Sequence, residues 1–367
     1  MTITVLQEHL IKALTRVGKT VSIKANLPVL QHIYMSASEG TLTVATTNLE
    51  TTTVYSFGGK VDKEGSICVP AKVIQELVAT LPQGKVTLEE KEGQLFVTSA
   101  GTSASIPGMS GSEFPPLPEK KSKKTIGFGK TILEAIPKVL FAAASDEGRP
   151  ILTGVKFQPI EGGLLLAATD GYRLSVKRIE GDVEITSNMI VPARALMDVV
   201  HIVKEDKTTT PVTLSLGDDG QLGFSVGDTD IYTRLIEGEF PNFEKIIPKT
   251  ATTTATIARE SLLRAIKSAA IFARDNANIV KLHIAGSTLT IAANTPQVGQ
   301  NSVDVDISLS GGEADIAFNS RFLLDFFANF EEEQVVFEMT GTLNPGVFHP
   351  INDETYLHII MPVRVQG

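Results

Sequence analysis

The stretch LLLAATDGYRL, Leu164 to Leu174, contains the pattern around which the whole chain is built. It predicts a strand of small and apolar residues that ends in a tight turn at Asp170-Gly171. A weaker copy, LTVATTNLE, runs from Leu42 to Glu50, and another, LTIAANTPQ, runs from Leu289 to Gln297. The central copy alone adds an aromatic residue and an arginine beside its turn, which suggests that it has an additional role.

Matching residues in the three copies are almost evenly spaced along the chain. Thr46 lies 123 residues before Thr169, which in turn lies 125 residues before Asn294. A pattern with helical spacing precedes each copy, starting near Thr4, Phe128 and Thr256. A second one follows each copy, in ICVPAKVIQELVATLP, MIVPARALMDVVHIV and DIAFNSRFLLDFFANF. This order and spacing predict three tandem domains, 1–124, 125–250 and 251–367.

The segments between the helical patterns alternate in polarity around glycine turns. IYMSASEGTLTVAT, GVKFQPIEGGLLLAAT and VKLHIAGSTLTIAA are examples, and such patterns predict β-hairpins. Proline-containing segments, 113–125 and 239–254, have the composition of surface linkers between domains. The predicted fold class is therefore α+β, with two helices packed on antiparallel sheets in each of three domains.

Composition indicates a globular protein of the reducing cytoplasm. Hydrophobic residues make up 42% of the chain and charged residues 20%, and no apolar run is long enough for a membrane span. The N-terminal residues lack the pattern of a secretory signal. Cys68 is the single cysteine, which excludes an intrachain disulfide.

The net charge of −9 is unevenly distributed. There are 13 basic and 11 acidic residues in 1–124, 13 and 18 in 125–250, and 7 and 13 in 251–367. Basic residues recur on the predicted helices away from their apolar faces, among them Lys12, Arg16, Arg194, Arg264 and Lys267. Each one alone is typical of a solvated helix surface. Together, on equivalent helices, they predict a surface that contacts nucleic-acid phosphates without reading bases.

No catalytic or cofactor-binding motif is present. The six histidines have no metal-ligand spacing, and there is no P-loop, dinucleotide fingerprint or nucleophile elbow. Asp304 and Asp306 alternate along one predicted strand, but two carboxylates without converging partners are typical of a solvated face. We therefore expect no metal, no cofactor and no enzymatic activity.

Several segments together resemble the bacterial sliding clamp family, the beta subunits of DNA polymerase III. They are VPAKVIQELVATLP, RPILTGVKF, LLAATDGYRLSV, EGEFPNFEKIIP, FNSRFLLD and the C-terminal MPVRV, and they span essentially the whole chain. The resemblance implies a head-to-tail homodimer whose three domains per chain close as a ring around duplex DNA. It also implies a processivity factor without exonuclease activity, which tethers proteins to DNA while sliding on it.

The resemblance implies a groove between the second and third domains for short clamp-binding peptides. The implied partners that carry such peptides are the replicative polymerase alpha subunit, the clamp loader, translesion polymerases, mismatch repair proteins and DNA ligase. The implied groove residues are Leu152, Thr169, Gly171, Tyr172, Arg173, Leu174, Pro241, Ile246, Asn319, Phe322, Pro345, Gly346, Ile359, Met361, Pro362, Val363 and Arg364.

Further residues are assigned by the same resemblance. Lys24 and Arg149 are implied to contact DNA. The dimer contact is implied to join a helix of the first domain to a helix of the third domain in the other chain, through Ile74, Leu77, Val78, Ile271 and Phe272. Two alternatives remain open: a peptide-binding scaffold that does not encircle DNA, and a metal-dependent hydrolase that uses Asp304 and Asp306.

Overall fold

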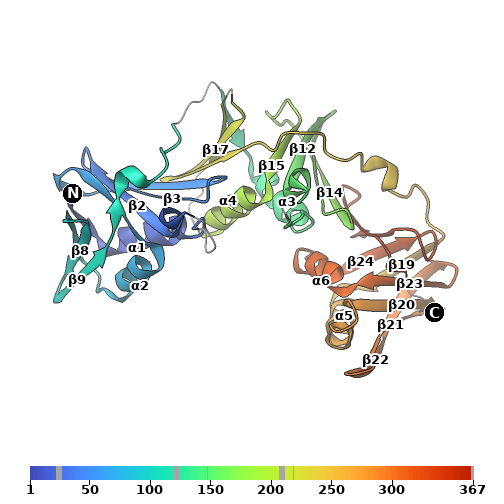
Figure 1. Cartoon of the computed structure of the whole chain (residues 1–367). Helices are drawn as coiled ribbons and strands as arrows, with labels where there is room; N and C mark the ends of the chain where they lie inside the picture. The colour runs from blue at the N-terminus through green and yellow to red at the C-terminus, as the bar shows by residue number, and fades with distance from the viewer. Residues whose placement is uncertain (22–26, 120–123, 147, 206–210, 218, 365–367) are drawn as a thin grey trace. The chain divides into compact units, whose positions relative to one another are not determined.

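The computed structural model describes residues 1–364 except 22–26, 120–123, 147, 206–210 and 218 (Figure 1). Contacts divide the chain into two compact units, Met1–Gly129 with Arg194–Leu235, and Lys130–Ala193 with Ile236–Gly367. The units cut through the predicted central domain, and the boundaries at 124/125 and 250/251 therefore remain a prediction.

The described part of the first unit contains two antiparallel sheets and three α-helices. The helices are α1 (Gln7–Gly18), α2 (Ala71–Thr80) and α4 (Ala193–Glu205). One sheet has the order β5 (Lys60–Lys63), β1 (Thr2–Leu6), β7 (Lys85–Lys91), β8 (Gln94–Ser99) and β9 (Thr102–Pro107). The other has the order β10 (Met109–Ser110), β6 (Gly65–Pro70), β2 (His32–Ser38), β3 (Thr41–Thr47), β4 (Thr52–Gly58), β18 (Thr229–Arg234), β17 (Gln221–Val226), β16 (Val212–Leu216) and β11 (Lys124–Phe128).

The second unit contains one long sheet of twelve strands. Its helices are α3 (Lys130–Leu140), α5 (Arg259–Ala273) and α6 (Ser320–Ala328). The strand order is β15 (Met189–Pro192), β12 (Gly154–Ile160), β13 (Gly163–Thr169), β14 (Arg173–Glu180), β26 (Tyr356–Ile360), β25 (Gly346–Pro350), β24 (Gln334–Met339), β19 (Thr253–Ala258), β22 (Gly299–Gly311), β21 (Thr288–Thr295), β20 (Ile279–Ala285) and β23 (Ala314–Asn319). Short 3-10 helices occupy Pro28–Gln31, Gly111–Glu113, Pro150–Thr153 and Glu244–Ile246.

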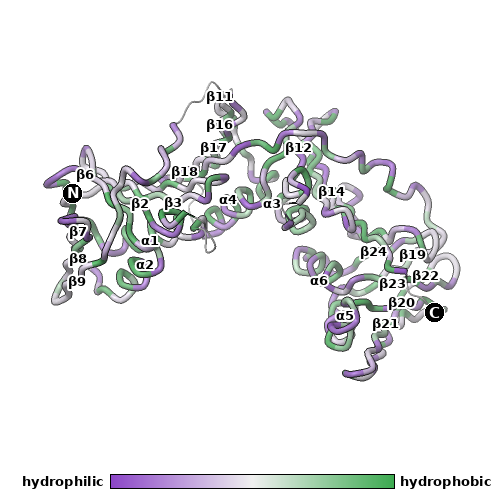
Figure 2. Tube along the Cα trace, in the orientation of Figure 1, coloured by the Kyte–Doolittle hydropathy of each residue, from purple (hydrophilic) through white to green (hydrophobic). Residues whose placement is uncertain are grey.

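The helices bury the apolar faces that their spacing predicts. In α1 the buried residues include Leu10, Leu14 and Val17, which pack with strands of both neighbouring sheets in one core cluster. In the second unit, α5 and α6 cover a core rich in phenylalanine, with Phe326 and Phe348 at 5.8 Å between ring centroids. Figure 2 shows apolar positions recurring along the helices and strands. The α+β prediction, with helices on antiparallel sheets, is confirmed.

Two strand pairs continue a sheet from one repeat into the next. In the first unit β4 pairs with β18, with Thr52 opposite Tyr232. In the second unit β14 pairs with β26, with Leu174 opposite Ile359. In each pair, the edge strand of one group of four strands lies beside the edge strand of another group. Both pairs therefore have the same construction, and each is called a joint.

Candidate functional site

The turn between β13 and β14 is fixed by its own side chains. The Asp170 Oδ1 atom accepts hydrogen bonds from the backbone N–H groups of Tyr172 (2.9 Å) and Arg173 (3.0 Å). The Thr169 hydroxyl donates to the Arg173 carbonyl at 2.6 Å and accepts from the Gly171 N–H at 3.0 Å. Gly171 has φ +92°, a conformation in which a glycine is least strained. The turn therefore presents the exposed Tyr172 side chain on a rigid backbone.

The first repeat contains the same turn with different side chains. Asn48 Oδ1 accepts hydrogen bonds from the N–H groups of Glu50 (3.1 Å) and Thr51 (2.7 Å), and the Thr47 hydroxyl donates to the Thr51 carbonyl at 3.1 Å. Thr47 therefore matches Thr169, and the predicted match of Thr46 with Thr169 is wrong by one residue.

Arg173 is held on several sides. Its Nε atom donates to Asp170 Oδ2 at 3.0 Å, and its Nη1 atom donates to Asp325 Oδ2 on α6 at 2.7 Å. The guanidinium carbon lies 4.6 Å from the ring centroid of Phe322 and 5.7 Å from that of Phe141. With its side chain only 9% exposed, Arg173 is part of the wall of this surface.

The carboxyl end of the chain lies beside this turn. The Met361 N–H donates to the Tyr172 carbonyl at 2.8 Å, directly after β26 ends. Two residues later, the Val363 N–H donates to the Ala317 carbonyl of β23 at 2.8 Å. Met361 and Tyr172 are both exposed, so an apolar surface forms where the end of the chain meets the turn.

On the other face of the same strands lies a small buried cluster. Leu174 and Ile359 pack there with Phe243, which directly precedes the 3-10 helix Glu244–Ile246. Ile246 itself is exposed. The linker 239–254 thus reaches the strands that carry the turn, which composition alone had shown only as a surface segment.

The predicted peptide-binding residues fall into three groups by exposure. Exposed residues, which a peptide can reach directly, are Gly171, Tyr172, Pro241, Ile246, Met361 and Arg364. Partly buried residues are Asn319, Phe322, Pro345, Pro362 and Val363. Buried residues, which support the others, are Leu152, Thr169, Arg173, Leu174, Gly346 and Ile359.

Below the turn lies a buried histidine that sequence reasoning treated as an ordinary strand residue. His358 Nδ1 shares a 2.6 Å hydrogen bond with the Ser175 hydroxyl across the β14–β26 pair. Its ring stacks on Phe326, with centroids 4.9 Å apart and planes at 8°. Burial, followed by the nearby Arg173 charge, lowers the pKa of His358 well below 6.5. The imidazole is therefore neutral at physiological pH.

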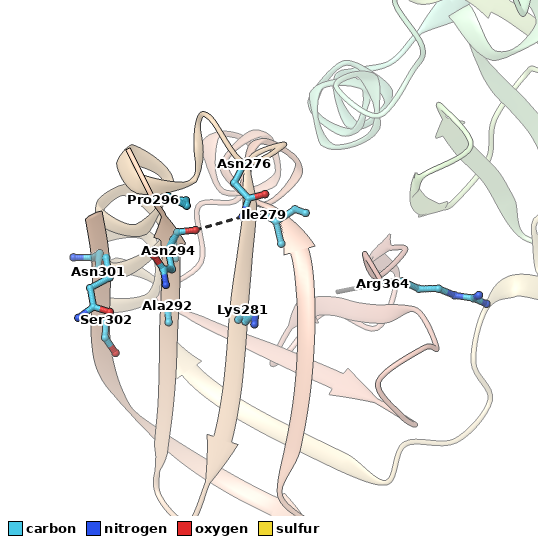
Figure 3. Close-up of a pocket in the computed structure, with 11 residues that line it drawn as sticks. Asn276, Ile279, Lys281, Ala292, Asn294, Pro296, Asn301, Ser302 and Arg364 are labelled. Atoms are coloured by element: carbon cyan, nitrogen blue, oxygen red, sulfur yellow. Dashed lines mark hydrogen bonds between the residues drawn. The ribbon is translucent and has the colours of Figure 1, made fainter. Parts of the chain in front are cut away.

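Two hollows lie near the end of the chain in the second unit. One, of about 910 Å³, is lined by residues of β20, β21 and β22, among them Lys281, Asn294 and Asn301, and by Asn276 before β20 and Arg364 (Figure 3). The other, of about 710 Å³, is lined by Leu343, Val363, Arg364, Lys281 and neighbouring residues. The exposed Leu343 was missed among the candidate residues, because a lone leucine in a polar loop carries no pattern.

The predicted DNA-contacting residues have different environments. Lys12, Arg194, Arg264 and Lys267 are exposed on their helices. Arg16 is 3% exposed, donates to the Thr229 hydroxyl at 2.8 Å and lies over the Tyr55 ring, so its prediction as a phosphate contact is wrong. Lys24 lies outside the described residues.

Arg149 belongs to the turn. A Cβ atom built on Gly171 would lie 3.2 Å from the Arg149 Nη1 atom, so the guanidinium lies directly beside the Tyr172 turn. Arg149 is exposed and precedes the 3-10 helix Pro150–Thr153, which contains Leu152. Arg149 therefore lies beside the residues predicted to bind peptides, and its implied contact with DNA remains a prediction.

The predicted dimer contacts need a partial correction. Ile74 and Val78 are fully buried in the core of the first unit, because they form the inner face of α2, and so cannot contact another chain. Leu77 and Phe272 are partly buried, and Ile271 is exposed. On α2 the large apolar residue that is exposed is Val73, one position before Ile74, which sequence reasoning missed.

The described residues lack two features, a metal-binding cluster and a membrane-spanning helix. No group of three or more histidine, cysteine, aspartate or glutamate side chains there could hold a metal ion. No helix in this part of the chain is long and apolar enough to span a membrane.

Three family models for the DNA polymerase III beta subunit match the chain in succession. The N-terminal domain model matches residues 1–118, the central domain model 129–242 and the C-terminal domain model 244–364. Among curated proteins, a "Beta sliding clamp" of Synechococcus elongatus is 28% identical over 370 residues, covering 98% of both chains. One from Staphylococcus aureus is 26% identical over 377 residues and covers 99% of both.

Solved structures give the same result. The DNA polymerase III beta subunit of Thermotoga maritima has a TM-score of 0.90 at 25% identity, with both chains fully covered. A sliding clamp of Bartonella birtlesii bound to griselimycin has a TM-score of 0.92, also at 25% identity and full coverage. Because its three matched parts follow one another over nearly its whole length, the chain belongs to the family of bacterial DNA polymerase III beta subunits, the beta sliding clamps.

Proposed function

We propose that two copies of this chain join head to tail into a ring around duplex DNA, where they slide and tether replication and repair proteins. A beta sliding clamp is a processivity factor and not an enzyme, so the chain's role is mechanical. We further propose that it acts in the cytoplasm, where bacterial DNA is replicated.

The observation that carries this proposal is a pair of complementary open sheet edges. The strands β6-β2-β3-β4 continue into β18, and β15-β12-β13-β14 continue into β26. The third group, β23-β20-β21-β22, ends at residues 299–306 of β22 with no strand beyond them among the described residues. In the first repeat, β9 is the edge strand of its sheet, with β8 on one side and no described strand on the other. A β9 strand from a second copy can pair with this β22 edge as β18 and β26 pair with theirs.

The repeat also predicts the register of this pairing. Gly299 holds the place of Thr52 and Leu174, because each pairs with the last residue before its turn. The paired residues can be traced strand by strand across each sheet. By this tracing, Ser105 of β9 holds the same place as Tyr232 and Ile359. We therefore propose that Ser105 of one copy lies opposite Gly299 of the other. Two such joints use both edges of both copies, which closes a ring of two.

Several exposed basic residues hold equivalent places in the repeats. Lys12 and Arg264 are each the sixth residue of the first helix in their repeat, α1 and α5. Lys72, Arg194 and Arg321 are each the second residue of the second helix, in α2, α4 and α6. In a closed ring these equivalent positions would face the DNA, where weak phosphate contacts permit sliding.

We propose that the surface around Tyr172 and Met361 binds short peptides of partner proteins. The exposed apolar side chains there offer anchors, and the backbone of the chain's carboxyl end lies alongside. The proposed partners are the replicative polymerase alpha subunit, the clamp loader, translesion polymerases, mismatch repair proteins and DNA ligase.

Retention on DNA of different topology tests the proposed encirclement. The chain, loaded by a clamp loader onto nicked circular DNA, is expected to remain bound through gel filtration at moderate salt. Linearising the same DNA with a restriction enzyme should release it, because a ring slides off the ends. Equal retention on circular and linear DNA would contradict encirclement and favour a scaffold that binds DNA-associated proteins without enclosing DNA.

A further inference from the structure

The ion pair between Arg173 and Asp325 joins the two parts of the proposed peptide surface. Arg173 begins β14, directly after the Tyr172 turn, whereas Asp325 belongs to α6, the helix that carries Phe322. The 2.7 Å bond between Arg173 Nη1 and Asp325 Oδ2 is the contact that links turn and helix through charge. The arginine side chain is 9% exposed and the carboxylate 49%, so we expect the bond to orient Arg173 more than to stabilise the fold.

The repeat shows that Asp325 occupies a position with a recurring acidic residue. Glu76, Asp198 and Asp325 are each the sixth residue of α2, α4 and α6. Asp198 is buried and accepts from the Thr20 hydroxyl at 3.4 Å, and Glu76 pairs with Lys72 of its own helix at 3.9 Å. Of these three acids, Asp325 is the one whose bond reaches an arginine beside the turn.

The same ion pair determines how Phe322 is presented. Asp170 and Asp325 bond to different edges of the Arg173 guanidinium, at Nε and Nη1, which leaves its faces to Phe322 and Phe141. Replacing the Asp325 carboxylate would remove the tie on the Nη1 side and allow the guanidinium to rotate. Phe322 would then lose the flat cation against which its ring rests.

We propose that Asp325 is a positioning residue for the peptide surface. Its carboxylate neutralises the Arg173 charge and holds the guanidinium in one orientation. The guanidinium in turn fixes the Phe322 ring for contact with an apolar side chain of the partner peptide. This inference rests on the proposed peptide-binding function and extends it to a residue outside the predicted set. It also leaves Arg149, exposed beside Gly171, as the cation at the turn that is available to a peptide carboxylate.

The chain offers a matched control. Lys177 Nζ donates to Asp353 Oδ2 at 2.6 Å, so this ion pair also joins β14 of the second repeat to a residue of the third, four residues further along β14. Removing Asp353 therefore deletes a comparable ion pair from the same joint without touching Arg173 or Phe322. A general weakening of the joint would affect both variants, whereas a positioning role would affect Asp325 variants alone.

The test is the affinity of a fluorescent peptide carrying the clamp-binding segment of the same species' polymerase alpha subunit. Asp325→Asn should weaken binding about tenfold, as expected for a lost charged hydrogen bond that orients a contact residue. Asp325→Glu should restore most of the affinity, and Asp353→Asn should leave it within about twofold. Because Asp325 is 49% exposed, thermal unfolding of Asp325→Asn should resemble that of Asp353→Asn.

A second readout follows the Phe322 ring itself. Its NMR resonances should shift in Asp325→Asn and stay unchanged in Asp353→Asn. If the unaltered chain and Asp325→Asn bound the peptide with equal affinity, the positioning role alone would be overturned. No binding by the unaltered chain would overturn the peptide function and this inference together.

Discussion

Asp170 and Asn48 hold the same position in two turns of the same construction. Each accepts two backbone N–H groups, and each follows a threonine whose hydroxyl closes the turn. At the next position Gly171 has φ +92° and Leu49 has φ +76°, so the first repeat places a leucine in a conformation that favours glycine. The local side-chain bonds, more than the glycine, therefore determine this turn.

The sequence puts forward the turn residues and Met361 to Arg364 as candidates, because TDGYRL and MPVR are contiguous motifs. Asp325 and Leu343 could not be predicted in this way. Their surroundings depend on residues distant in the sequence, since Asp325 pairs with Arg173 and Leu343 lines a hollow together with Val363. Arg16 was misassigned for the same reason, since helical spacing places it beside Lys12 but cannot show that Thr229 approaches it.

Asp198 provides a prediction at the residue scale. Burial raises the pKa of its carboxyl above the ordinary 3.8, against the opposing effects of Arg194 and the Thr20 hydrogen bond. The folded state therefore holds this proton more tightly than the unfolded state, so stability falls as the pH rises above about 3.8 and stays reduced at neutral pH. Asp198→Asn should raise the unfolding temperature at pH 7 by about 2 °C and leave it unchanged at pH 3.

Thermal unfolding of both proteins at the two pH values checks this expectation. Glu205→Gln, on the same helix and paired with Lys19 at the surface, is the control and should change the unfolding temperature little at either pH. A lower unfolding temperature for Asp198→Asn at pH 7 would mean that the charged carboxylate stabilises the joint.

At the scale of elements, the helices next to each joint are equivalent by position. Lys19 and Thr20, which follow α1, contact Glu205 and Asp198 of α4. Counted from the helix start, Ile271 and Phe272 of α5 hold these same places. On α2, Val73 holds the place of Phe322 on α6, which faces the joint through Arg173.

These equivalences predict that Val73 and Ile271 meet across the joint between copies. Their side chains are 47% and 51% exposed in the single chain, so Val73→Asp or Ile271→Asp should leave folding intact. In the assembly the new carboxylate would be buried against apolar surface, at a cost of several kcal/mol, and should produce monomers in sedimentation velocity. Leu49→Asp, at a 61% exposed position away from this joint, should stay dimeric.

A substitution at Ile74, next to Val73, shows the effect expected for a core residue in place of an interface residue. Ile74→Asp should unfold the first unit and not merely separate the copies, because Ile74 is fully buried in its core. Dimers that persist in both Val73→Asp and Ile271→Asp would show that these helices do not form the contact.

For the whole molecule, periodicity predicted the fold class because every repeat carries the same helix and hairpin patterns. It could not predict how contacts group the chain, since strands such as β18 pair with β4 of the preceding repeat and α4 belongs to the first unit. Periodicity also says nothing about the open edge of β22, which becomes visible only when the strand order is known. That edge and β9 are the observations that support the ring we propose.

The mass of the native assembly tests the central claim of two open edges joined between copies. One chain has a mass of 39.3 kDa, and two such chains supply the two joints that close the ring. Sedimentation equilibrium or native mass spectrometry at micromolar concentration should therefore give twice the mass of the chain, with no larger species. A mass of 39.3 kDa, or an open series of higher multiples, would contradict a closed ring of two.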